Sequence, residues 1–174
     1  EKLTEIQKKN YFALDVRENM LKKLKEKYPE VNSSIGDCQQ KLKHEDDFFD
    51  RIIAIHVLEH LPNLPETVIE MYRLCKKKEG ILQVVIPCEG GLAYSFARMI
   101  STKRIFEKRY GQSFKWFIER EHLNKPAEIF EELKSYFEII ETQYFPFLIK
   151  AQFCNLCIGL KLTPFPERTF DQNN

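Results

Sequence analysis

The feature that most constrains the fold is a short apolar run that ends abruptly in titratable residues. Residues 52–55 are Ile-Ile-Ala-Ile, and His56, Glu59 and His60 follow directly. An apolar run without alternation predicts a strand buried on both faces, as in a parallel sheet covered by helices. Because open α/β sheets bind ligands at the carboxyl ends of their strands, the three polar residues are candidates for a functional site.

Segments with the pattern of strands alternate with segments that have the spacing of helices. Strands are predicted at residues 11–14, 31–35, 51–56, 81–86, 136–144 and 153–162. Helices are predicted at residues 1–9, 20–28, 66–78 and 126–134, with residues 92–120 helical in at least two pieces. The alternation predicts an α/β fold with a doubly wound, mostly parallel sheet. The short connection between the last two strands predicts that they are antiparallel to each other.

Composition and charge argue against several classes of protein. The 174 residues suffice for one domain with a core, and the formal net charge of +1 favours neither nucleic acid nor an anionic membrane surface as a partner. No apolar run approaches the roughly 18 residues that a membrane span needs. The five cysteines, an odd number, favour a reducing, cytoplasmic location. Nothing in the composition indicates an oligomeric state.

Cys154 and Cys157 form a Cys-x-x-Cys pair within the last predicted strand. Residues three apart on a strand face opposite sides of the sheet. Since the chain has no second such pair, buried free thiols are favoured over a metal or redox site.

Two acidic residues follow the first two predicted strands. In nucleotide-binding doubly wound folds, an acid placed like Asp15 accepts hydrogen bonds from ribose hydroxyls, and one placed like Asp37 can reach an adenine amino group. The alternative for each is a helix cap or a turn residue. Their joint placement favours the binding role.

At this point several motifs together resemble a known family. They are YFALD at residues 11–15, GD at 36–37, FDRII at 49–53, VLEHL at 57–61 and GIL at 80–82. The chain resembles the class I S-adenosylmethionine-dependent methyltransferases over residues 1–162, and is most similar to the group that includes the ubiquinone-biosynthesis O-methyltransferases. The resemblance implies a Rossmann-like methyltransferase domain at residues 1–163, followed by a polar tail at 164–174.

The resemblance also implies a cofactor, S-adenosylmethionine, and residues to hold it. Asp15 is expected to bind the cofactor ribose. Asp37 and the backbone at Cys38 are expected to hold the adenine, and His56 is expected to lie beside the methyl group.

One part of the family pattern is not among the 174 residues, which begin at Glu1. This part is the family's central first strand and the glycine-rich loop after it. We expect the natural protein to carry that segment upstream, because its loss would leave a gap of about 10 Å between the strands at 11–14 and 51–56. The alternative is a degenerate domain that no longer binds the cofactor.

His56, Glu59, His60 and the distant His122 form a second group of candidates. Some relatives, including small-RNA 2′-O-methyltransferases and ubiquinone-pathway enzymes, hold a divalent metal with an acid-x-x-Glu-His element and a later histidine. This chain has His56 in place of the first acid, a set that would suit zinc or iron better than magnesium. The alternative is that these side chains order a turn and a loop. We expect no metal site.

Residues 92–122 lie where this family inserts a lid over the acceptor pocket. Basic and aromatic residues interleave in residues 98–120, and we expect Arg104, Lys108 and Arg109 to bind the acceptor. Such a lid suits an anionic or amphipathic acceptor. A solvated amphipathic helix pair is the alternative, and the pattern also permits single-stranded nucleic acid, which we do not favour.

The expected function is methyl transfer from S-adenosylmethionine to an oxygen nucleophile on a small-molecule acceptor. A neutral histidine can take the proton of a hydroxyl acceptor, and His60 and His122 are the candidates. The alternative is a non-catalytic binding or scaffold domain on the same fold. A Gly-x-Gly loop upstream would favour the enzyme, and its true absence would favour the scaffold.

Overall fold

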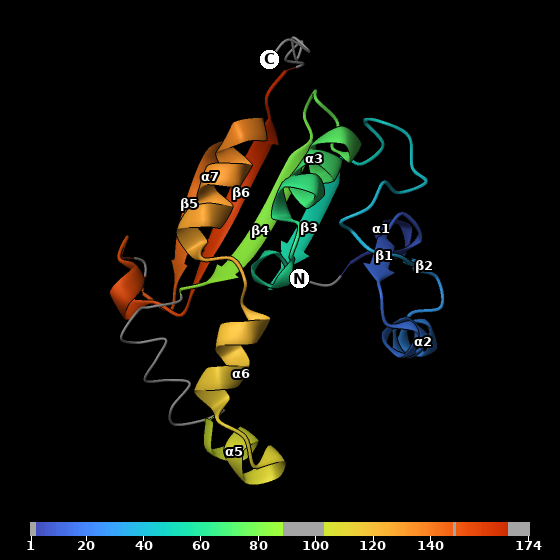
Figure 1. Ribbon diagram of the computed structural model, residues 1–174. Coiled ribbons are helices and arrows are strands. Elements are labelled where there is room, and N and C mark those ends of the chain that lie inside the picture. Colours follow the sequence, from blue (N-terminus) through green and yellow to red (C-terminus); the bar gives the residue numbers. More distant parts are fainter. Residues whose placement is uncertain (1–2, 89–102, 148, 167–174) are drawn as a thin grey trace. The chain divides into compact units, whose positions relative to one another are not determined.

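The computed structural model describes residues 3–88, 103–147 and 149–166, and it divides the chain into two compact units (Figure 1). Unit 1 is Glu1–Lys43 and unit 2 is His44–Asn174. Each unit is described by itself.

Unit 1 is a small parallel strand pair with two helices. Its elements are α1 (Glu5–Lys9), β1 (Phe12–Asp15), α2 (Glu18–Lys27) and β2 (Asn32–Ile35). The two strands pair in parallel, with Phe12 opposite Asn32 and Asp15 opposite Ile35. Helix α1 begins with a capping box, in which Thr4 and Gln7 each bind the other's backbone N–H. The pair follows the predicted strands at 11–14 and 31–35 to within one residue.

Unit 2 is built on a four-stranded sheet with the order β3-β4-β6-β5. Strands β3 (Arg51–Ile55) and β4 (Ile81–Pro87) are parallel, whereas β6 (Cys157–Pro164) runs antiparallel to both β4 and β5 (Phe137–Phe145). The helical elements are η1 (Leu58–His60), α3 (Leu64–Leu74), α5 (Arg104–Tyr110), α6 (Phe114–Glu121), α7 (Pro126–Tyr136) and η3 (Gln152–Cys154). The predicted antiparallel pairing of the last two strands is confirmed.

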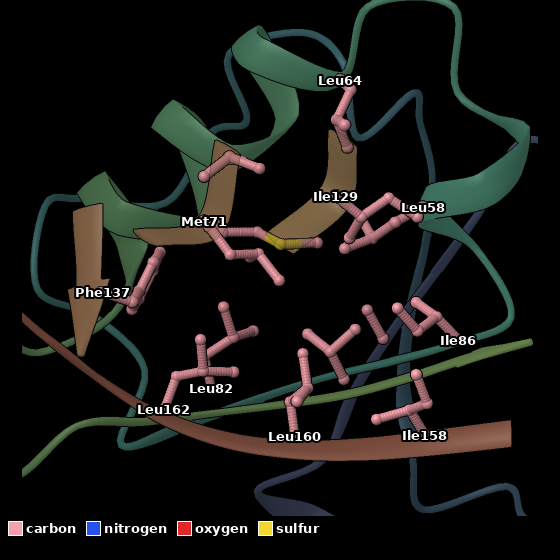
Figure 2. Packing of buried hydrophobic residues seen from close by; sticks show 14 of the residues in the cluster. Leu58, Leu64, Met71, Leu82, Ile86, Ile129, Phe137, Ile158, Leu160 and Leu162 are labelled. Atoms are coloured by element: carbon pink, nitrogen blue, oxygen red, sulfur yellow. The ribbon is translucent and has the colours of Figure 1, made fainter. Parts of the chain in front are cut away.

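The core of unit 2 lies between one face of this sheet and helices α3 and α7 (Figure 2). Alternate residues of the two central strands point into it, as the period of two in a strand requires. They are Leu82, Val84 and Ile86 from β4 and Ile158, Leu160 and Leu162 from β6. Val68 and Met71 of α3 and Ile129 and Leu133 of α7 close the core from the helical side.

Strand β3 is less buried than its apolar sequence predicts. Among the described strands it pairs only with β4. Ala54 is buried against the core, but the side chains of Ile53 and Ile55 on the other face are 45% and 57% exposed. The expectation of burial on both faces is therefore wrong for the described structure, because helices cover one face of this sheet within unit 2.

Helix α3 ends at Leu74, four residues before its predicted end. Beyond it the chain extends, because Cys75 forms a parallel bridge with Phe49. The ammonium of Lys77 donates to the carbonyl oxygens of Tyr72 and Cys75, at 2.6 and 3.0 Å. These contacts satisfy carbonyl groups that the helix end leaves without intrahelical donors.

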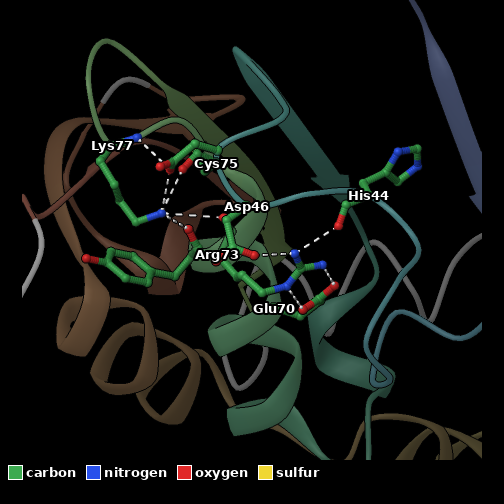
Figure 3. Close-up of polar contacts among 8 residues, drawn as sticks. His44, Asp46, Glu70, Arg73, Cys75 and Lys77 are labelled. Atoms are coloured by element: carbon green, nitrogen blue, oxygen red, sulfur yellow. Dashed lines mark hydrogen bonds and ion pairs between the residues drawn. The ribbon is translucent and has the colours of Figure 1, made fainter.

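An ion-pair network ties α3 to the segment before β3 (Figure 3). The guanidinium of Arg73 donates to both carboxylate oxygens of Glu70, at 2.7 and 2.8 Å. It also donates to the Asp46 carboxylate at 2.6 Å and to the His44 carbonyl oxygen at 2.9 Å. Because Glu70 is largely buried, this pairing is what makes its charge tolerable.

The Cys-x-x-Cys pair is not within one strand. Cys154 is the last residue of η3 and Cys157 is the first residue of β6. The prediction that Cys154 and Cys157 lie on opposite faces of one strand is therefore wrong, because Cys154 precedes the strand. All five cysteines are free thiols in this structure.

Among the helices in the described ranges, none has the length and apolar character that crossing a bilayer requires.

Candidate functional site

The candidate site in unit 2 begins where strand β3 ends. The His56 amide still donates to the Val85 carbonyl oxygen at 2.9 Å, which continues the ladder between β3 and β4. His56 itself has φ of 52°, in the left-handed region that costs a non-glycine residue on the order of 1 kcal/mol or more. This turn directs the chain into η1, so the polar residues after the strand gather at its carboxyl end.

Glu59 is the buried centre of this group. It is 1% exposed, although no lysine or arginine pairs with it in the described structure. Its Oε1 atom lies 3.1 Å from His56 Nδ1 and 3.9 Å from His60 Nε2. Its Oε2 atom is buried and makes no hydrogen bond within the described residues. A buried carboxylate oxygen without a partner is rare, and it is a recognised mark of functional sites.

His60 is oriented by the backbone of α6. Its Nδ1 atom lies 2.7 Å from the carbonyl oxygen of Glu121. A carbonyl oxygen only accepts, so Nδ1 must carry the proton, and in the neutral ring Nε2 then carries the free lone pair. His60 therefore presents a basic nitrogen on the side of Glu59, on a side chain that is 39% exposed.

His122, the second candidate base, lies beside His60. The two rings meet edge to face, with centroids 4.7 Å apart. The contact depends on the segment after α6, because the Glu59 carbonyl oxygen accepts from the amides of Leu123 and Asn124, at 2.8 and 3.2 Å.

Asn124 is a structural residue of this site that the sequence analysis missed. Its side-chain Nδ2 donates to the carbonyl oxygens of Leu58 and Leu61, at 2.8 and 2.7 Å. It thereby clamps the η1 turn to the end of α6. No local pattern marks such a residue, because its partners lie more than 60 positions away in the sequence.

Within the described ranges, no three His, Cys, Asp or Glu side chains are arranged so that they could hold a metal ion.

In unit 1, Asp15 ends β1 and binds its own turn. Oδ1 accepts from the Arg17 amide and Nε, at 2.9 and 3.0 Å, and Oδ2 accepts from Arg17 Nη2 at 3.1 Å. The side-chain hydrogen bonds from Arg17 hold the pKa of Asp15 below its ordinary value of 3.8. A carboxylate has about four acceptor positions, so Asp15 keeps capacity for a hydroxyl of the cofactor ribose.

Asp37 follows β2 at the same end of the strand pair as Asp15, since Gly36 donates its amide to the Asp15 carbonyl oxygen at 3.3 Å. Its Oδ1 accepts from the Gln39 amide at 2.9 Å, so Asp37 is a turn residue. Cys38 lies within this turn. Two acidic side chains at the carboxyl edge of parallel strands suit the binding of a nucleoside. Both side chains also hydrogen-bond within their own turns, which is the alternative role given for them in the sequence analysis.

The predicted lid is helical where the structure describes it; residues 89–102 lie outside the described ranges. Gly111, with φ of 64°, separates α5 from α6, and the Phe106 ring packs on those of Phe114 and Phe117. Lys108 and Arg109 are exposed on α5, and Arg104 is its first residue. Helices α5 and α6 thus contact each other through aromatic rings, and α5 carries exposed cations.

Comparison with known proteins gives a family for the first part of the chain. Residues 1–83 match a family described as "Methyltransferase domain". No curated protein has a significantly similar sequence.

Solved structures resemble most of the chain. The PH0226 protein of Pyrococcus horikoshii OT3 shares 17% identity with a TM-score of 0.64, over 88% of this chain and 71% of that protein. The N-methyltransferase NodS of Bradyrhizobium japonicum WM9, crystallised with S-adenosyl-L-homocysteine, shares 14% identity with a TM-score of 0.57, over 90% and 66%. A TehB-like S-adenosylmethionine-dependent methyltransferase of Corynebacterium glutamicum shares 13% identity with a TM-score of 0.59, over 88% and 67%.

These similarities confirm the Rossmann-like methyltransferase fold that the sequence predicts, whereas they do not confirm the ubiquinone-biosynthesis group. The chain spans between 66% and 71% of the length of these three proteins. The methyltransferase-domain match covers residues 1–83, and the solved structures show the fold of the chain.

Proposed function

We propose that this protein methylates an oxygen nucleophile on a small, anionic or amphipathic acceptor. The observation that carries the proposal is the fixed ring of His60. Its Nδ1–H is committed to the Glu121 carbonyl oxygen, so Nε2 is the nitrogen that can take a proton. General bases of this kind contribute about 10²- to 10⁴-fold to a rate.

Bound S-adenosylmethionine supplies an activated methyl group on a sulfonium. The chain has to align the acceptor and to remove its proton, and alignment supplies most of the effect. His60 Nε2 accepts the hydroxyl proton as the acceptor oxygen becomes nucleophilic. The Glu59 carboxylate, 3.9 Å away, stabilises the imidazolium that results, and it is therefore a positioning residue. His122, whose ring meets that of His60 edge to face, is the second candidate base.

For the cofactor we propose four residues: Asp15 for the ribose, Asp37 and the backbone at Cys38 for the adenine, and His56 near the methyl group. The capacity of Asp15 for a further hydrogen bond supports its role. The strained turn at His56 supports a functional position, since such backbone conformations cluster at active sites.

For the acceptor we propose Arg104, Lys108 and Arg109 on α5. The exposed cations Lys108 and Arg109, on a helix that leads to the His60 site, would raise the local concentration of an anionic acceptor. The free thiols support the expected cytoplasmic location of such an enzyme.

Formation of S-adenosylhomocysteine with a panel of phenols, hydroxy acids and amines tests this function. We expect turnover with a hydroxyl compound, and a loss of about 10²-fold or more in kcat for His60→Ala. His44→Ala is the matched control, because His44 packs on Phe48 and Phe49 away from the site. Turnover of amines alone, or equal rates for the two variants, would refute the proposed oxygen chemistry.

A non-catalytic binding domain is the second candidate, and the Arg17 guanidinium bound on both oxygens of Asp15 is the observation in its favour. Calorimetric measurement of S-adenosylmethionine binding, together with an assay of turnover, distinguishes the enzyme from the binding domain. Binding of S-adenosylmethionine with turnover supports the enzyme, whereas no binding by the full natural protein supports the scaffold.

We also propose that catalysis needs no metal. Treatment with a chelator should change the rate by less than about twofold, because methyl transfer from a sulfonium requires no Lewis acid. Loss of activity that a divalent ion restores would instead assign His56, Glu59, His60 and His122 as ligands.

A further inference from the structure

The last residue of β5 and its connection to β6 expose several large apolar side chains. Phe145 is 62% exposed, Phe147 54%, Ile149 64% and Phe153 62%. We call these four residues the apolar loop. Single exposed apolar residues are ordinary on a protein surface, but several within one loop mark an interaction site.

The apolar loop is held in shape by a buried amide. Asn155 is fully buried, and its Oδ1 accepts from the Phe147 amide at 2.8 Å. Its Nδ2 donates to the carbonyl oxygens of Ile149 and Ala151, at 2.9 and 2.8 Å. The exposed side chains are thus attached to an ordered backbone.

The strand register places this loop at the same end of the sheet as the His60 site. Pro87, at the carboxyl end of β4, lies opposite Cys157, and Cys157 lies opposite Phe145. Ile55, the last residue of β3, pairs with Val85 near that end of β4. Helices α5 and α6 extend from this end as well (Figure 1).

The helices add interfacial aromatic residues and positive charge. Ile105, Tyr110 and Trp116 are 67%, 58% and 48% exposed. Residues 103–121 contain six basic and three acidic residues, while the whole chain has a net charge of only +1. The cations Lys108, Arg109 and Arg120 are exposed, and the Arg120 guanidinium stacks on the Trp116 ring at 4.4 Å.

We propose that this end of unit 2 binds the surface of an anionic lipid bilayer. The apolar loop enters the boundary between headgroups and acyl chains, Tyr110 and Trp116 lie at the headgroup level, and the cations of α5 and α6 contact anionic headgroups. Exposed apolar side chains, amphipathic aromatic rings and cations together are the composition that such an interface selects. The charge complementarity favours a bilayer over a second copy of this chain, which would bring the same cations together.

Vesicle sedimentation with the full chain tests the proposal without any methyl acceptor. The probes are vesicles of phosphatidylcholine alone and of phosphatidylcholine with phosphatidylglycerol. We expect binding to the anionic vesicles only, weakening as salt rises because the Debye length shortens. Trp116 is the single tryptophan of the chain, so its emission should shift to the blue on binding and report contact at α6 directly.

Loop variants show whether the apolar loop carries the binding. The F147S/I149S variant should bind anionic vesicles about tenfold or more weakly, because two side chains lose apolar burial. Ile149→Ser and Ile140→Ser form a matched pair, since Ile140 is also exposed but lies near the start of β5. Only the first should weaken binding. All of these side chains are exposed, so thermal melts should stay close to wild type.

Three results would overturn the proposal. They are no binding to either vesicle, equal binding of wild type and F147S/I149S, and equal effects of the two isoleucine variants. Sedimentation analysis adds a fourth: concentration-dependent dimers that F147S/I149S abolishes would assign the loop to self-association. None of these results depends on methyl transfer, so failure here and failure of the proposed enzyme are distinguishable.

Discussion

The Nδ1 atom of His60 lies 2.7 Å from the carbonyl oxygen of Glu121, and this contact decides which nitrogen of the ring is basic. The donor is the last residue of η1, and the acceptor is the last residue of α6. The last helix of the predicted lid (residues 92–122) therefore ends by orienting the candidate base.

The first prediction concerns the carboxylate behind that base. Glu59→Gln keeps the shape of the side chain but removes the charge that faces the protonated His60 ring. We expect kcat to fall by about tenfold or more while the acceptor KM changes little, because the charge acts only when the ring is protonated. Steady-state kinetics measure the separate changes in kcat and in the acceptor KM. A change confined to KM would show that Glu59 serves only acceptor binding.

The second prediction concerns the cofactor. In the intact protein, Asp15→Ala should weaken S-adenosylmethionine binding by about 1.5–3 kcal/mol, as expected for the loss of charge-assisted hydrogen bonds. Arg17→Ala is the matched control, because it removes the local partner of Asp15 and leaves the carboxylate. Titration calorimetry that finds unchanged affinity for Asp15→Ala would remove this residue from the cofactor site.

The third prediction concerns the acceptor. Neutralising Arg104, Lys108 and Arg109 together should raise the acceptor KM and leave cofactor affinity nearly intact, because the proposed cofactor contacts lie elsewhere. The effect should shrink as salt rises, since exposed charges are screened. Kinetics at low and high salt check both points. Normal turnover by the triple variant at low salt would make these three charges a solvated helix surface.

The fourth prediction compares two ion pairs of unit 2. Arg73→Leu should lower the free energy of unfolding by about 3–5 kcal/mol, because it removes the guanidinium that pairs with the buried Glu70 carboxylate. Lys76→Leu removes the exposed pair with Asp50 and should cost no more than about 1 kcal/mol. Denaturant unfolding of the two variants measures the difference. Equal losses would contradict the role of burial.

The fifth prediction concerns alkaline pH. Burial raises the pKa of the Cys75 thiol from 9.0 to about 11. Between these values the unfolded chain releases the proton while the folded chain keeps it, so stability falls as pH rises from 9.0 to about 11. The loss should be roughly 1–3 kcal/mol. Cys75→Ala should flatten this slope in pH-dependent denaturant melts, and an unchanged slope would exclude Cys75 as its source.

Elements with a strong local signal were predicted closely. Strand β4 differs from its prediction by one residue, because an apolar run acts through the adjacent backbone. The end of α3 was misplaced, since it depends on Phe49 and Lys77, which no helix pattern contains. The exposure of Ile53 and Ile55 was missed, because an apolar run does not reveal which faces neighbours cover.

The candidate site was likewise predicted in part from the sequence. The position of His56, Glu59 and His60 at the end of a strand followed from the sequence alone. Spacing could not predict that Glu59 is the buried member of the three, or that the His122 ring meets the His60 ring edge to face. Both facts depend on the clamp that Asn124 forms between segments distant in the sequence.

The hydrogen bonds of Asn155 to the backbone of the apolar loop have a consequence for the thermodynamics of association. A loop whose backbone is already fixed loses little conformational entropy when a partner covers it. Asn155→Ala would keep every apolar side chain of the loop but release its backbone. Its association should then carry a larger unfavourable entropy with nearly the same change in heat capacity, because the buried apolar area is unchanged. The amide thus acts as a preorganising element, and its effect would be visible in calorimetry.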